Sequence, residues 1–131
     1  ISEHHGFDIT GHKFDFYKPN TELNILPNSG IFTICALEQI GDKYKLFVDY
    51  LLDKKPKICL HIEPINELYD ENSEFENIAL KFHHSRNYLN NYLSYLKKLE
   101  SEKKIRILKI KKINFGSLYH DGYSILVWEI I

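Results

Sequence analysis

The sequence lacks several features that would restrict its class. It contains no methionine, only 2 cysteines and no apolar run that approaches the roughly 18 residues of a membrane-spanning helix. No signal peptide is visible, so a membrane protein is not predicted. Because the chain begins at Ile1 rather than at methionine, we expect it to be a processed product or a piece of a longer protein, whose upstream part holds some of the function.

The composition is typical of one soluble globular domain. The 131 residues are 44% hydrophobic and 27% charged, and the formal net charge of −1 provides no global field for nucleic acid or an anionic membrane. Cys35 and Cys59 both fall within apolar segments. Two interpretations are a disulfide and two small buried side chains in a reducing compartment, and we favour the second, with a cytoplasmic location.

The first half of the chain is predicted to contain strands around one helix. Asp42 is placed to cap that helix, and Pro56 follows its end. The predicted segments are an irregular polar entry over 1–13, a short strand over 14–17, a strand over 29–36, a helix over 42–54 and a strand over 58–62.

The second half begins with a long helical pattern and ends in a hairpin. Ser73 and Glu76 have the spacing of a capping box, and the pattern that follows runs to about Lys103 with a break near 84–87. Apolar and basic residues alternate over 105–115, a turn is predicted over 116–122, and 123–131 forms the last strand. The short connection requires the last two strands to pair antiparallel.

This order predicts a single α/β domain over 1–131. Strand–helix–strand connections favour parallel pairing with right-handed crossovers. We therefore expect an open, mostly parallel sheet with helices on its faces and a C-terminal antiparallel hairpin.

Polar side chains follow two predicted parallel strands where each ends. Glu38 and Gln39 come just after the strand over 29–36, while His61 and Glu63 alternate onto one face of the next strand. Carboxyl ends of parallel strands share one edge, so Glu38 and Glu63 are predicted to lie together at a crevice. The alternatives are a base with its orienting group, an ordinary carboxylate at a helix start, and a metal site, for which the spacing provides no further ligand.

The segment KFHHSRNYL, over 81–89, concentrates other candidate residues. His83, Arg86 and Tyr88 would grip an anionic or hydroxyl-rich substrate if the segment covers the crevice. A solvated helix face is the alternative. The basic stretch over 97–112 is interleaved with acidic and apolar residues and has no nucleic-acid-binding motif, so we interpret it as a solvated face.

Several motifs together resemble one enzyme family. IFTICALEQIG, KICLHIEP and the C-terminal segment ILKIKKINFGSLYHDGYSILVWEI are similar to the second half of class I S-adenosylmethionine-dependent methyltransferases. In that family the last strand inserts antiparallel between its neighbours. HIEPI with the following YD, KFHHSRNYL and FGSLYHDGYS resemble a bacterial subgroup associated with sugar or surface-polysaccharide gene clusters.

The resemblance implies a partial Rossmann-like methyltransferase fold and methyl transfer to oxygen or nitrogen of a small polar acceptor, such as a sugar or sugar-linked intermediate. The cofactor would be S-adenosylmethionine, with no metal. The implied roles are catalysis by Glu38, His61 and Glu63, substrate binding by Gln39, Tyr69, His83, Arg86 and Tyr88, and cofactor binding by Cys35 and Ala36.

The sequence departs from the family in two elements. The glycine-rich loop after the first strand and the acidic residue that binds the cofactor ribose are not found among these residues. We therefore expect the chain alone to be inactive and to bind the cofactor poorly. The alternative function is a non-catalytic module that self-associates through an exposed sheet edge, and a metal-dependent hydrolase using Glu38, His61 and Glu63 is a third hypothesis.

Overall fold

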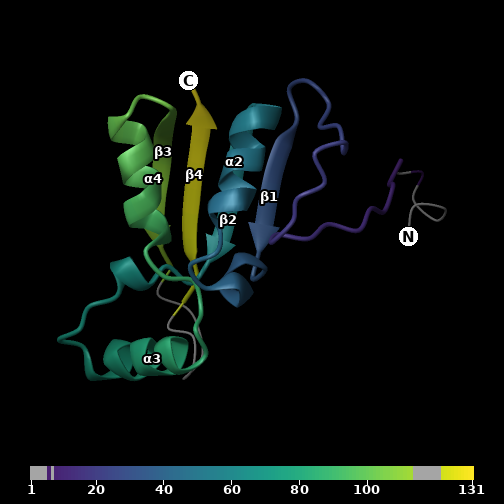
Figure 1. The fold of residues 1–131 in the computed structure, drawn as a ribbon. Coiled ribbons are helices and arrows are strands. Elements are labelled where there is room, and N and C mark those ends of the chain that lie inside the picture. The colour runs from purple at the N-terminus through teal and green to yellow at the C-terminus, as the bar shows by residue number, and fades with distance from the viewer. Residues whose placement is uncertain (1–5, 7, 114–121) are drawn as a thin grey trace.

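The protein has an α/β fold built on one four-stranded sheet (Figure 1). The structure is a computed structural model that describes residue 6 and residues 8–113 and 122–131. Its strands are β1 (Gly30–Ile34), β2 (Ile58–Glu63), β3 (Ile105–Lys112) and β4 (Ser124–Ile130), in the spatial order β1-β2-β4-β3.

The direction of the strands confirms the hairpin and corrects the expectation of a mostly parallel sheet. β1 and β2 pair parallel, as the crossover through one helix requires. β4 pairs antiparallel with both β2 and β3, so two of the three strand pairs are antiparallel. The correction has a topological cause, because β4 returns from β3 and inserts between β3 and β2, as the family resemblance implied, so that it forms antiparallel pairs on both sides.

Among the residues that the structure describes, three α-helices accompany the sheet. They are α2 (Lys45–Lys54), α3 (Glu74–Ser85) and α4 (Tyr92–Ser101), and short 3-10 helices η1 (Leu37–Ile40) and η2 (Asn66–Leu68) follow β1 and β2. The predicted break in the long helical pattern is present between α3 and α4. Figure 1 shows α2 and α4 running alongside the strands, whereas α3 lies beyond the end of the sheet.

The two predicted helix caps have different outcomes. Ser73 caps α3, because its Oγ accepts a hydrogen bond from the Glu76 N–H at 3.4 Å. Asp42 does not cap α2, which begins at Lys45 after Tyr44 without a side-chain cap. The buried Tyr44 ring, which packs on Tyr92 at 5.0 Å between centroids, lies where the helix starts.

The core lies on one face of the sheet, beneath α2 and α4. Alternation places Cys59, His61 and Glu63 of β2 on this covered face, next to Ser124, Leu126 and Trp128 of β4. Helix α2 contributes Phe47, Val48 and Leu51, and α4 contributes Tyr92, Leu93, Leu96 and Leu99.

Residues 14–17 form no strand, contrary to the prediction. Phe14 and Phe16 pack as half-buried rings against Phe47 of α2, with ring centroids 5.9 and 4.9 Å away. Their alternation therefore comes from two rings that reach the same helix, and no ladder forms. Of the predicted irregular segment 1–13, residues 8–13 contain neither helix nor strand, while 1–5 and 7 lie outside the described residues.

The opposite face of the sheet is far more exposed, and its β1 side is apolar. Phe32 and Ile34 of β1 are 68% and 53% exposed, and Ile58 of β2 is also exposed. The predicted turn over 116–122 falls mostly outside the described residues. In the part that is described, no helix has the length and apolar character needed to cross a membrane.

The covered face should dominate the stability of the fold. Leu96→Ala removes a fully buried side chain of α4 and should lower the free energy of unfolding by about 2–5 kcal/mol in urea denaturation. Leu46→Ala, on the exposed side of α2, is the matched control and should change it by less than about 1 kcal/mol. Equal losses in the two variants would contradict this assignment of the core.

Candidate functional site

The carboxyl ends of β1 and β2 meet at one edge, as predicted, and the Glu63 carboxylate joins them. Its Oε1 accepts hydrogen bonds from the main-chain N–H groups of Ala36 and Leu37 at 3.1 and 3.2 Å. Its Oε2 accepts the N–H of Glu38 at 3.2 Å. Glu63 is fully buried. Burial raises the pKa of its carboxyl, while the three main-chain donors and a side-chain hydrogen bond from Thr33 act in the opposite direction.

These contacts give Glu63 a positioning role. Both of its oxygens accept hydrogen bonds from the turn that carries Glu38, and the side chain has no exposure to solvent. Glu63 lies beside Glu38 where β1 and β2 end, as predicted, but the open crevice predicted there is not supported, because both side chains are buried. The predicted role of Glu63 as a directly acting catalytic group has no support in this geometry.

The Glu38 carboxylate can still accept hydrogen bonds. Its Oε1 accepts a hydrogen bond from the Gln39 side-chain amide at 2.9 Å. Its Oε2 is buried and has no hydrogen-bond partner among the residues that the structure describes. A buried carboxylate oxygen without a donor is costly, so this atom is suited to receive a hydrogen bond from a bound molecule.

Cys35, Ala36 and Tyr123 form the rest of the edge around Glu38. Cys35 and Ala36 are half-buried, and Cys35 has a positive φ of 51° where the chain leaves β1. Tyr123 precedes β4 and hydrogen-bonds through its side chain with Cys35. That bond, together with burial and the nearby charges of Glu38 and Glu63, raises the pKa of the Tyr123 phenol to about 12.

His61 lies in the core and away from any crevice. Its Nδ1 is 2.8 Å from Thr33 Oγ1, and its ring stacks on Trp128 with centroids 6.0 Å apart. Tyr92 and Phe47 meet the same ring edge-on. Burial lowers the pKa of His61 to about 3, so the ring is neutral at physiological pH. The predicted catalytic role of His61 has no support here, because its ring packs against three aromatic rings and its Nδ1 is engaged with Thr33.

The segment 81–89 does approach the sheet edge, as the sequence suggested. The Leu89 N–H donates to the carbonyl of Glu38 at 3.0 Å, and the Asn90 N–H lies 3.4 Å from the carbonyl of Gly41. Gly41 has a φ of 59°, and a Cβ there would lie 2.9 Å from the carbonyl oxygen of Asn87. Glycine is thus required for the two segments to lie this close.

The predicted substrate-binding residues divide into buried and exposed groups. His83 is fully buried, with Nδ1 2.8 Å from Asn66 Oδ1 and its ring between those of Tyr69 and Tyr88. These contacts indicate a structural role for His83. Arg86 is exposed, with its guanidinium 5.6 Å from the Phe82 ring centroid, and Tyr88 is half-buried. Gln39 is exposed next to Glu38.

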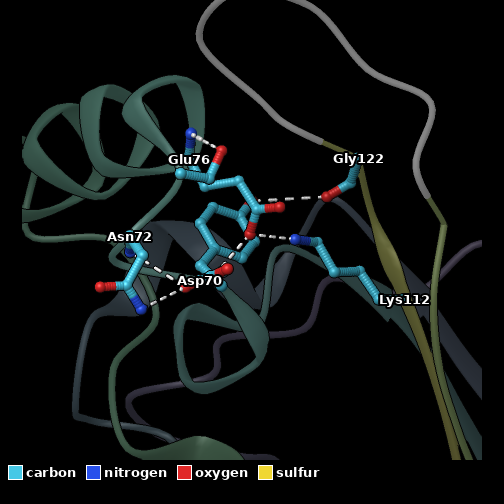
Figure 2. A network of polar contacts seen from close by, with 7 residues as sticks. Asp70, Asn72, Glu76, Lys112 and Gly122 are labelled. Carbon is cyan, nitrogen blue, oxygen red and sulfur yellow. Dashed lines mark hydrogen bonds and ion pairs between the residues drawn. The ribbon is translucent and has the colours of Figure 1, made fainter.

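A network of polar contacts anchors α3 to the sheet (Figure 2), and Tyr69 belongs to it. Its hydroxyl donates to the Gly122 carbonyl at 3.4 Å, and the Lys112 ammonium lies 4.8 Å from its ring centroid. Lys112 also forms an ion pair with Glu76, whose carboxylate accepts the Asp70 N–H at 2.6 Å. The Glu76 side chain therefore does not complete the predicted capping box, because it joins α3 to β3 instead.

A metal centre is not supported. Within the described residues, no group of three His, Cys, Asp or Glu side chains is arranged to hold a metal ion. The hypothesis of a hydrolase with Glu38, His61 and Glu63 as ligands therefore fails on geometry, because His61 faces Thr33 and Glu63 is taken by main-chain donors.

Comparisons with known proteins provide no family for this chain. No protein-family model, curated protein or solved structure matches it.

Tyr123 is the edge residue that sequence reasoning missed. A strand that runs antiparallel to β2 starts at the edge where β2 ends, so the residue before β4 faces Cys35. The predicted hairpin already contained this information, because its second strand was expected between parallel neighbours.

The hydrogen bonds that Glu63 accepts should stabilise the fold. In Glu63→Gln an amide NH₂ replaces one oxygen and faces a main-chain N–H, so the free energy of unfolding should fall by about 1–3 kcal/mol in urea denaturation. Glu71→Gln makes the same change at an exposed position and should stay within about 0.5 kcal/mol of the parent chain. Equal stabilities of the two variants would refute the positioning role.

The neutral His61 ring should make folding sensitive to acid. Unfolded histidine binds a proton below about pH 6.5, whereas folded His61 does so only near 3, so unfolding becomes easier as pH falls between these values. The contribution reaches at most about 1.4 kcal/mol per pH unit and is absent above pH 6.5. Denaturation followed by circular dichroism should show a shallower decline for His61→Gln and an unchanged decline for the exposed control His84→Gln.

Proposed function

We propose that this chain is the substrate-side part of an S-adenosylmethionine-dependent methyltransferase, which transfers a methyl group to oxygen or nitrogen of a small polar acceptor such as a sugar or sugar-linked intermediate. We also propose that the enzyme is cytoplasmic, which agrees with the free thiols of Cys35 and Cys59.

The strand order is the observation that carries this proposal. β4 inserts antiparallel between β2 and β3, and β1 and β2 run parallel beside them. This is the arrangement that the resemblance leads one to expect of the second half of the methyltransferase sheet. This order requires the second strand of a hairpin to separate β2 and β3, which point in the same direction.

Glu38 is the residue that best fits the chemistry. Methyl transfer is a direct displacement in which the acceptor atom must be aligned and must lose a proton. The unpaired Oε2 of Glu38 is suited to accept that proton from an acceptor hydroxyl or amine. Glu63 and Leu89 hold the main chain of Glu38 from two sides, through its N–H and its carbonyl. Arg86 and Tyr88, close along the chain to Leu89, are the substrate-binding candidates that remain accessible.

Cys35 and Ala36 fit one wall of a cofactor site. Both are small and half-buried at the carboxyl end of β1, the end at which open α/β sheets bind ligands, and the Tyr123 side chain lies beside Cys35. When bound, the cofactor supplies an activated methyl group on a sulfonium. The glycine-rich loop and the ribose-binding acid are not found among the 131 residues, so this wall alone should bind the cofactor weakly.

A second candidate function is self-association without catalysis. The observation that favours it is the position of β1 at one end of the strand order, with no described strand on its outer side. A stable dimer in sedimentation equilibrium that is lost on changing β1 would favour this function.

Cofactor binding should distinguish these functions. Titration calorimetry with S-adenosylmethionine should give no heat with the 131-residue chain and clear heat with the product of its complete gene. Glu38→Gln in that product should keep binding and reduce methyl transfer by at least about 10²-fold, as expected for loss of a general base. Absence of binding by the complete product would overturn the proposal.

A further inference from the structure

Two buried carboxylates lie together where β1 and β2 end, and neither is paired with a cation. Glu63 has no exposure to solvent, and Glu38 is only 7% exposed. No ion pair formed within residues 8–113 and 122–131 includes either of them. His61 of β2 is neutral at physiological pH and adds no positive charge. Because buried charges in proteins are normally paired, this edge has an excess of negative charge.

Hydrogen bonds satisfy the two carboxylates to different extents. Glu63 accepts three main-chain N–H groups, which favour its ionised form. Glu38 accepts one neutral donor, the Gln39 amide, on Oε1, and its buried Oε2 accepts none from the part of the chain that the structure describes. A carboxylate has about four acceptor positions, so Glu38 can accept several further donors.

Gln39 provides a route from solvent to the Glu38 carboxylate. Its side chain is exposed, and its bond to Glu38 Oε1, at 2.9 Å, is the one hydrogen bond that it forms with described residues. Movement of this single side chain therefore uncovers Oε1 at the loss of one neutral hydrogen bond. The Gln39 amide thus occupies a position that a stronger donor from solvent can take.

We propose that this edge binds a primary amine in its ammonium form, with Glu38 as its direct partner. The ammonium replaces the Gln39 amide and donates to Oε1 and Oε2 of Glu38. Hydrogen bonds between charged groups are roughly twice as strong as those between neutral groups, so the exchange is favourable. Glu63, which accepts the main-chain N–H of Glu38 at 3.2 Å, adds a second negative charge close to the ligand.

An ammonium group fits this edge better than other donors do. A hydroxyl donates one hydrogen bond and leaves both carboxylate charges uncompensated. An ammonium is a compact charge with three donors, whereas a guanidinium is a rigid planar fork that needs more room beside the deeply buried Glu38. A metal ion needs several ligands, and the described residues contain no group of three such side chains arranged to hold one.

The inference selects nitrogen over oxygen as the acceptor atom. This choice rests on the proposed methyl transfer, whereas the binding of the amine does not. Transfer of one proton from the bound ammonium to Glu38 Oε2 leaves a lone pair on nitrogen, which an acceptor atom must have in order to react. Among small polar acceptors, an amino sugar has this chemistry.

The test is titration of the ¹⁵N-labelled 131-residue chain with methylammonium chloride. Methylammonium should shift the main-chain amide signals of Glu38 and Gln39 and the side-chain NH₂ signals of Gln39 in a saturable manner. Potassium chloride at the same ionic strength and methanol are the controls, and neither should produce these shifts. Methylguanidinium should bind more weakly than methylammonium.

Three variants test the assigned roles. Glu38→Gln keeps the shape of the side chain, removes its charge and should weaken binding at least about tenfold. Glu71→Gln removes the same charge at an exposed position and should change the affinity less than about twofold. Gln39→Ala removes the competing amide and should tighten binding, which a purely structural role of Gln39 would not produce.

Circular dichroism and the β2 amide signals identify the variants that fold, and Gln39→Ala decides the matter if Glu38→Gln does not fold. The inference would be overturned by the absence of saturable shifts up to about 100 mM methylammonium. Equal shifts with potassium or methanol, tighter binding of methylguanidinium, or full binding by folded Glu38→Gln would also overturn it. The cofactor titration contains no amine, so failure of cofactor binding would remove the methyltransferase proposal and leave the amine site intact.

Discussion

The three main-chain hydrogen bonds accepted by Glu63 hold the edge of this molecule together. They fix the turn that leaves β1 against the end of β2, and they do so with a charge-bearing group buried beside the core. The positions of Cys35, Ala36 and Glu38 all follow from this contact, because these residues belong to the turn that the carboxylate holds. Burying the Glu63 carboxylate costs free energy. The hydrogen bonds from three main-chain N–H groups, which would otherwise be unpaired, offset that cost.

The edge is held from the other side by the connection between α3 and α4. Leu89 donates to the carbonyl of Glu38, and Gly41 allows the main chain at Asn87 to come close. The network of Tyr69, Glu76 and Lys112 in turn joins the start of α3 to the end of β3. The main chain of Glu38 is thus held from two sides, while one oxygen of its side chain has no hydrogen-bond partner among the described residues.

The strands and their partners could be predicted from local patterns, whereas the environment of the polar residues could not. Apolar runs bounded by Gly and Pro located β1 and β2, and the short connection identified the β3–β4 hairpin. Alternation also placed His61 and Glu63 on one face. It did not indicate whether that face is a crevice or a core, because Tyr92 and Trp128, which pack against His61, come from distant parts of the sequence. The strand predicted over 14–17 was wrong for a similar reason. Phe14 and Phe16 alternate as residues of a strand do, but here both rings contact α2.

Trp128 is the single tryptophan of the sequence, and it is fully buried with its ring stacked on neutral His61. The tryptophan emission of this protein therefore originates from one side chain buried in its core. Because this ring packs on His61, any conformational opening that lets water reach the pair should change that emission. The fold thus contains its own optical reporter of core integrity, with no added label.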